Sequence, residues 1–147
     1  MSKNPSFKEQ VRRNLVALIS LAVAVTSLGY NTWRNEASEH NRNKRLIAIE
    51  LLSIVGQMNQ AVLEAGYGSE VSAGIHRRKA WAMAATINDL AMVAEGEVPA
   101  AAQGLFETWK TEVVRLRTGD TDAAIANINT ALEIVRSATH DVLRSLE

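Results

Sequence analysis

The stretch from Leu15 to Tyr30 contains no charged side chain, and no other segment restricts the fold of this 147-residue chain as strongly. As a helix, its 16 residues extend about 24 Å, whereas the hydrocarbon core of a bilayer is about 30 Å thick. Arginine stems and aromatic rings at the two ends lengthen the usable span, because both place their polar parts at the lipid headgroups. The sequence therefore predicts a transmembrane helix over residues 13–33, after a short basic N-terminal tail over residues 1–12. The predicted membrane-interface residues are Arg12, Arg13, Tyr30, Trp33 and Arg34.

A cleaved signal peptide is the alternative interpretation of the same segment. The tail is basic, the apolar run has a suitable length, and Ser27 and Gly29 are small residues before a cut site. Tyr30 and Trp33 favour the anchor, because aromatic side chains are typical of the membrane–water interface. A buried core helix is a third interpretation, which the flanking basic and aromatic residues disfavour.

Small residues repeat along one face of this predicted anchor. Ala17, Ser20, Ala24 and Ser27 follow one another at spacings of three and four, which is one stripe of a helix. Small side chains let a second membrane helix approach closely. The stripe is thus a possible helix-packing seam for a homodimer or for a larger membrane partner, although membrane helices are rich in small residues in general.

The charges predict an orientation. The tail has four basic residues and one acidic residue, a net charge of +3, and residues 34–147 have 12 basic and 15 acidic residues, a net charge of −3. Because basic flanks stay on the cytoplasmic side, the N-terminus is predicted to be cytoplasmic and the rest to lie across the membrane. Basic residues soon after the anchor weaken this prediction.

Residues 34–45 form a polar segment in which only Ala37 is apolar, and no Pro or Gly interrupts it. A polar helical stalk and a flexible linker both fit this composition. With the helix predicted to begin near Ser6, one helix would run through the anchor without a break. The remaining residues, 46–147, are predicted to form a helical-bundle head.

Four amphipathic segments make up this head, separated by breaks at residues 66–69, 95–97 and 119–120. Ser69, Pro99, Gly119 and Asp120 are predicted to cap or start helices. The second segment is predicted to run to Ala94. Apolar residues repeat over three heptads in the last segment, which is typical of coiled coils and bundles. The fold class is therefore predicted as all-α, an N-terminal transmembrane helix continuing into an antiparallel up-down four-helix bundle. The predicted inner residues of the second segment are Ile75, Trp81, Ala84, Ala85, Asn88 and Ala91.

The chain carries few groups suited to catalysis or metal binding. It has no cysteine, only three histidines (His40, His76 and His140), and no Glu-x-x-His motif. The sequence therefore predicts a non-enzymatic protein with no catalytic residue, cofactor, metal, small-molecule substrate or nucleic-acid partner. Trp81 and Trp109 are predicted as core aromatics. The basic run from His76 to Lys79 is predicted to be a solvated face, with an anionic ligand or partner as the alternative.

Two resemblances bear on this plan. A membrane helix running into a helical bundle resembles the four-helix sensory heads of bacterial chemoreceptors, but those receptors have a second membrane helix and an output domain. The segments Asn31 to Leu52 and Ala101 to Trp109 resemble a group of uncharacterised proteobacterial single-pass membrane-anchored proteins. That resemblance implies the bacterial inner membrane and no assigned activity. With the orientation predicted from the charges, the head would lie in the periplasm.

Three functions fit these predictions. The first is an accessory or scaffold protein whose partners are the bilayer and another membrane protein or a second copy of the chain. The second is a sensory or ligand-binding head that signals through a separate membrane partner. The third, a secreted soluble bundle, requires the signal peptide. Convergent polar groups inside the bundle would favour the second function, and an apolar core would favour the first.

Overall fold

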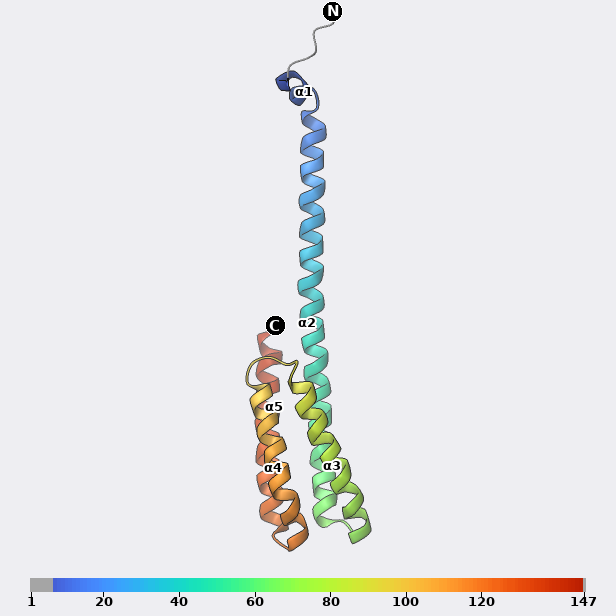
Figure 1. Cartoon of the computed structure of the whole chain (residues 1–147), viewed down its shortest axis with the longest axis vertical. Helices are drawn as coiled ribbons and strands as arrows, with labels where there is room; N and C mark the ends of the chain where they lie inside the picture. The colour runs from blue at the N-terminus through green and yellow to red at the C-terminus, as the bar shows by residue number, and fades with distance from the viewer. Residues whose placement is uncertain (1–6, 147) are drawn as a thin grey trace, which may run out of the picture. The chain divides into compact units, whose positions relative to one another are not determined.

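The computed structural model describes residues 7–146, and within this range the chain is all-helical with no strand (Figure 1). The predicted all-α class is confirmed. The chain divides into two units, Met1–Asn41 and Arg42–Glu147, and the division falls inside the longest helix. The helices are α1 (Phe7–Arg13), α2 (Leu15–Tyr67), α3 (Glu70–Ala91), α4 (Val98–Thr118) and α5 (Thr121–Ser145).

In the first unit, a turn at Asn14 separates α1 from α2, so the prediction of one unbroken helix is wrong. The predicted start near Ser6 lies outside the described residues. Hydrogen bonds from Asn14 N to Gln10 O and from Leu18 N to Asn14 O, each 3.0 Å, cross the turn. Asparagine disfavours helix interiors because its short amide side chain competes for backbone hydrogen bonds, which explains a break at this position.

Helix α2 is long and apolar enough, by length and composition, to cross a membrane, and a signal sequence satisfies the same criteria. No other helix among the described residues does so. The polar segment 34–45 is helical and belongs to α2. Of the two interpretations of this segment, a helix agrees with the structure, and its role as a stalk stays a prediction.

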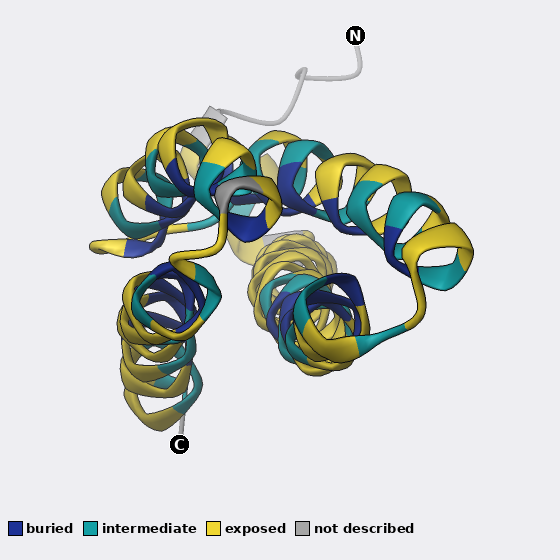
Figure 2. Ribbon diagram, turned by 90° about the horizontal axis from the view of Figure 1, so that it is seen from below, coloured by how far each residue is buried: buried dark blue, intermediate teal, exposed yellow. Residues whose placement is uncertain are grey.

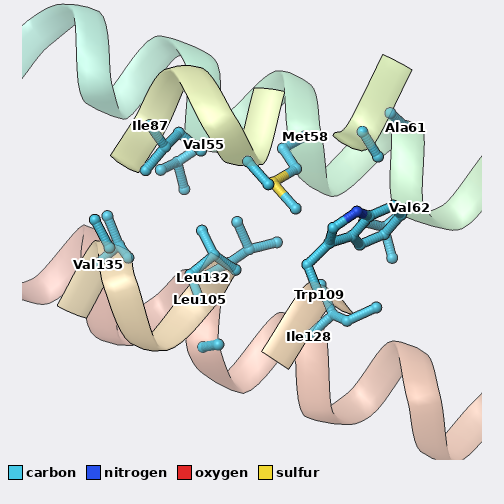
Figure 3. Close-up of a cluster of buried hydrophobic side chains, with 14 of the residues drawn as sticks. Val55, Met58, Ala61, Val62, Ile87, Leu105, Trp109, Ile128, Leu132 and Val135 are labelled. Carbon is cyan, nitrogen blue, oxygen red and sulfur yellow. The ribbon is translucent and has the colours of Figure 1, made fainter. Parts of the chain in front are cut away.

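The second unit is organised around one hydrophobic core to which α3, α4, α5 and the C-terminal part of α2 all contribute. Figure 2 shows the buried faces of these segments turned toward one another and the exposed faces turned outward. In Figure 3, Trp109 of α4 extends into this core beside Val62 of α2 and near Ile128 of α5. The fully buried large side chains include Leu51, Val55, Met58, Val62, Ile87, Leu105, Trp109, Ile128, Leu132 and Val135.

Polar contacts at both ends fix the relative direction of α2 and α5. Arg45 donates to the carbonyl oxygen of Leu146 at 2.6 Å, and the Tyr67 hydroxyl donates to Asp122 Oδ1 at 2.7 Å. The beginning of this part of α2 thus meets the end of α5, and its end meets the beginning of α5. The two segments are antiparallel.

Local signals place most helix ends. Ser69 is the N-cap of α3, where its hydroxyl accepts a hydrogen bond from Ser72 N at 3.4 Å, and Gly119 ends α4 with a φ of 97° that suits glycine. Asp120 precedes α5 but makes no capping bond, because its carboxylate pairs with Arg115. Helix α3 ends at Ala91 rather than the predicted Ala94, and its last residues give way to i→i+3 turns.

The predicted inner face of α3 is right at Ala84 and Ala91 and wrong at Ile75 and Trp81. Its buried residues are Ala73, Ala80, Ala84, Ile87 and Ala91, whereas Ile75 and Trp81 are 52% and 44% exposed. The fully buried Trp109 of α4 belongs to the same core cluster as the buried alanines of the central and C-terminal parts of α3. Trp81 is therefore not a core aromatic, and Trp109 is.

Two glycines of α2 allow the packing of α2 on α5 to be tested. A Cβ at Gly66 would lie 2.6 Å from Ile125 Cδ1 and 2.9 Å from Thr121 Cγ2, whereas a Cβ at Gly56 would meet nothing within 4 Å. We expect Gly66→Ala to lower the free energy of unfolding by about 1 kcal/mol through overpacking. We expect Gly56→Ala to raise it by about 0.5–1 kcal/mol through helix propensity.

Thermal unfolding of the full-length chain in mild detergent, followed by circular dichroism, measures both changes. Both variants carry a Gly→Ala change on α2, so each is the control for the other. A Gly66→Ala variant as stable as the Gly56→Ala variant would contradict the close approach of α5 to the end of α2.

The Tyr67–Asp122 contact predicts a pH dependence. The pKa of Tyr67 is raised from 10.0, first by its hydrogen bond to Asp122 and then by burial and the nearby negative charge. The raised pKa means that folding favours the neutral phenol, so this contribution is complete below pH 10 and is lost as pH rises through the raised pKa. In a Tyr30→Phe background, absorbance titration at 295 nm should show that Asp122→Asn lowers the pKa of Tyr67. Asp141→Asn, on the same helix, should leave it unchanged; an equal shift in both variants would be evidence against the contact.

Candidate functional site

The residues predicted to contact the membrane lie on α1 and on the N-terminal part of α2. Large apolar side chains between Leu15 and Trp33 are 47–77% exposed. Tyr30 and Trp33 lie together, with ring centroids 6.2 Å apart and planes tilted by 46°. Arg12 is exposed on α1, and Arg34 is exposed one residue after Trp33. Arg13 ends α1, and its side chain lies outside the description.

The predicted packing seam is a continuous exposed stripe of α2. Ala17, Ser20, Ala24 and Ser27 are all exposed. Nearby hydroxyls are satisfied within the helix, since Thr26 donates to Ala22 O at 2.8 Å and Thr32 donates to Leu28 O at 2.9 Å. A helix with satisfied hydroxyls and apolar side chains on every face suits a lipid environment better than water.

Few polar groups reach the interior of the second unit. Glu112 and Thr139 are the buried polar residues of the described range. The Thr139 hydroxyl donates to Val135 O at 2.8 Å, and Glu112 accepts bonds from Asn127 Nδ2 at 2.8 Å and from Arg115 at 2.9 Å. The pKa of Arg115 is raised, first by its hydrogen bond to Asp120. These groups satisfy one another, so they form a structural network and not an internal ligand site.

Three buried polar atoms have no hydrogen-bond partner among the described residues: His76 Nδ1, Trp109 Nε1 and Asn129 Oδ1. They belong to α3, α4 and α5 respectively. Residues 7–146 also contain no group of three His, Asp or Glu side chains placed to hold a metal ion.

The most distinctive surface feature is a groove of about 420 Å³ between α3 and α4, which we call the α3–α4 groove. Apolar side chains of both helices and three guanidinium groups line this groove. Most of these side chains are exposed or half-buried, so the groove is open to solvent. Its lining residues are Gly74, Arg77, Arg78, Trp81, Val113, Val114 and Arg117.

Aromatic side chains extend the groove along α4. The rings of Trp81 and Phe106 lie 5.7 Å apart between centroids, tilted by 58°. Lys110 Nζ lies 5.3 Å from the centroid of Phe106, a cation–π distance, and also pairs with Glu107 at 2.7 Å. The exposed Trp81 is thus held in place by a neighbour on α4 and presents an apolar face next to the arginines.

Sequence reasoning missed this groove for an identifiable reason. Because four consecutive residues point in four directions round a helix, the sequence predicts that the basic run from His76 to Lys79 is a solvated face. The structure divides the run: Arg77 and Arg78 line the groove, whereas Lys79 does not. The available signal was the spacing of Gly74, Arg77, Arg78 and Trp81, which is one helical stripe.

No protein-family model, no curated protein and no solved structure matches this chain. The resemblances to proteobacterial membrane-anchored proteins and to chemoreceptor heads therefore stay predictions.

Proposed function

We propose that this chain is a membrane-anchored helical-bundle protein that acts, without catalysis, as an accessory or scaffold subunit through protein–protein contacts. The N-terminal part of α2 spans the bilayer, and the second unit binds another membrane protein or a second copy of the chain. The observation that carries the proposal is the unequal placement of apolar surface. The apolar side chains of residues 15–33 are exposed on all sides of the helix, whereas the second unit forms its hydrophobic core without these side chains.

We infer that the second unit is an antiparallel up-down four-helix bundle. The antiparallel contacts between α2 and α5 support this class, as do the short connections between successive helices. A largely apolar core, in which Glu112 and Thr139 are the buried polar residues of the described range and both are hydrogen-bonded, supports a binding module that presents its outer surface. It gives less support to a ligand-sensing head, which would need polar groups converging inside.

Topology is the first part of the proposal to test, and the absence of cysteine makes a single introduced thiol specific. Lys8→Cys marks the tail and Ser137→Cys marks an exposed position on α5. With a cytoplasmic N-terminus and a periplasmic bundle, a membrane-impermeant maleimide should label only Ser137→Cys in intact bacterial spheroplasts. Lysis should expose both positions.

Each alternative topology gives a different result. Labelling of Lys8→Cys alone in intact spheroplasts would mean the reverse orientation. A mature chain that lacks the Lys8→Cys position, by intact mass, would mean a cleaved signal peptide and a secreted bundle. A chain in the soluble fraction with an intact N-terminus would contradict the membrane anchor itself.

Partner binding is the second part to test. We expect the chain, purified from native membranes in mild detergent and crosslinked, to be recovered with a stoichiometric membrane protein or as a defined homo-oligomer. Mass spectrometry of the crosslinked peptides identifies both the partner and the contacting residues. Recovery as a monomer with no intermolecular crosslink would contradict the subunit proposal and move attention to a self-contained sensor.

A further inference from the structure

The arginines of the second unit fall into two groups according to their partners. From Arg45 onward the chain has seven arginines. Four of them are engaged: Arg45 with the Leu146 carbonyl, and Arg115, Arg136 and Arg144 with carboxylates. The other three, Arg77, Arg78 and Arg117, make no ion pair or hydrogen bond with any described residue, and all three line the α3–α4 groove.

The sequence explains this division. Arg115, Arg136 and Arg144 each have an acidic residue three positions earlier, and each pairs with it. This i,i+3 pairing is the ordinary way in which a helix neutralises a surface arginine. The same position is occupied by Gly74 before Arg77, by Ile75 before Arg78 and by Val114 before Arg117. Asp120 lies three positions after Arg117, but its carboxylate pairs with Arg115. No ion pair therefore takes up the five N–H donors that each groove arginine offers.

The charge of the surroundings makes the groove selective. Residues 34–147 have a net charge of −3, yet the described residues that line the groove include three arginines and no carboxylate. An acidic partner is repelled by most of this surface and attracted at one place, so electrostatics favours one docking position. Guanidinium groups bind carboxylates with paired, directional hydrogen bonds, which suits aspartate and glutamate side chains.

The groove also offers apolar contact and an open shape. Trp81 and Val114 are 44% and 57% exposed at its edge, and Gly74 adds no side chain above Arg77, whose Nη2 would lie 3.8 Å from a Cβ there. A small molecule usually needs a concave site that buries most of its surface. This groove is open to solvent and combines basic and apolar side chains of two helices, which fits an extended or helical protein segment better.

We propose that the α3–α4 groove is the docking site for an acidic segment of a partner protein. Carboxylates of that segment pair with Arg77, Arg78 and Arg117, and an apolar side chain of the segment packs against Trp81 and Val114. This inference rests on the proposed function, because it names the chemistry of the partner that the subunit binds. Like other exposed charge contacts, the attachment weakens as salt concentration rises.

The first test is charge reversal in the full-length chain purified from native membranes in mild detergent. Arg78→Glu with Arg117→Glu should reduce the recovered partner at least about tenfold at low salt, because two attractive contacts become repulsive. Lys79→Glu is the matched control: it removes a positive charge from the same basic run but lies outside the groove, so the partner should be retained. Circular dichroism melting of each variant shows that the bundle is intact.

The second test identifies the chemistry of the occupant. Arg78→Lys or Arg117→Lys places an amine in the groove, and a water-soluble carbodiimide then couples that amine to any carboxylate bound beside it. Mass spectrometry should find an amide between the introduced lysine and an aspartate or glutamate of the partner. Lys79 supplies an amine outside the groove and should give no such link.

The outcomes separate this inference from the proposed function. A partner that the Arg78→Glu, Arg117→Glu variant retains in full would overturn the groove assignment and leave the subunit proposal standing. A link to a second copy of this chain would mean that the groove is an interface between copies. It would overturn the assignment of the groove to an acidic segment of a partner protein. A chain recovered alone, with no intermolecular link from either lysine variant, would overturn both proposals.

Discussion

The second unit depends on one stripe of α2, the buried residues between Ala48 and Ala65. Side chains of this stripe form a single cluster with those of α3, α4 and α5, and each fully buried Leu, Val or Met contributes about 1.5–3 kcal/mol relative to exposure. The N-terminal part of the same helix has no such partners among the described residues, and its apolar side chains stay exposed. One helix therefore carries two apolar surfaces: the first is exposed, and the second is buried within its own unit.

The core closes by matching one large side chain to a face of small ones. Trp109 is fully buried, and α3 contributes four alanines and Ile87 to its buried face. Both Trp109 and α3 contribute to one hydrophobic core cluster, and protein cores pack large and small side chains together at high density. The cost is the indole N–H, which has no partner among the described residues and loses its hydration, a penalty of about 1–3 kcal/mol. Burial of the large ring offsets this penalty, which is why the position suits tryptophan even without a hydrogen bond.

Much of this fold could be predicted from the sequence, because the spacing of apolar residues and the residue types at helix ends determine it. The faces of α5 and of the buried part of α2 followed from spacings of three and four, and Ser69 and Gly119 marked helix ends through their local chemistry. The face of α3 was predicted correctly at Ala84 and Ala91 but not at Ile75 and Trp81, because hydrophobicity alone does not separate a large apolar side chain at the surface from one in the core. The turn at Asn14 was missed because an apolar pattern on its C-terminal side outweighs one polar residue. The α3–α4 groove needs residues from two helices, and no pattern within either helix predicts that they meet.

The distribution of carboxylates decides which surfaces are left for a partner. Where an acidic residue precedes a basic one by three positions, as at Glu107 and Lys110 or Glu133 and Arg136, the charge is neutralised within one helix turn. An incoming carboxylate must compete there with a neighbour that is always present at high effective concentration. At Arg77, Arg78 and Arg117 the residue three positions earlier is glycine, isoleucine or valine, and Asp120, three positions after Arg117, pairs with Arg115. No ion pair within a helix turn therefore occupies these three arginines. An acidic segment gains the full charge-assisted contact at these three residues and little elsewhere, and this difference confines docking to the α3–α4 groove on a unit whose overall charge repels it.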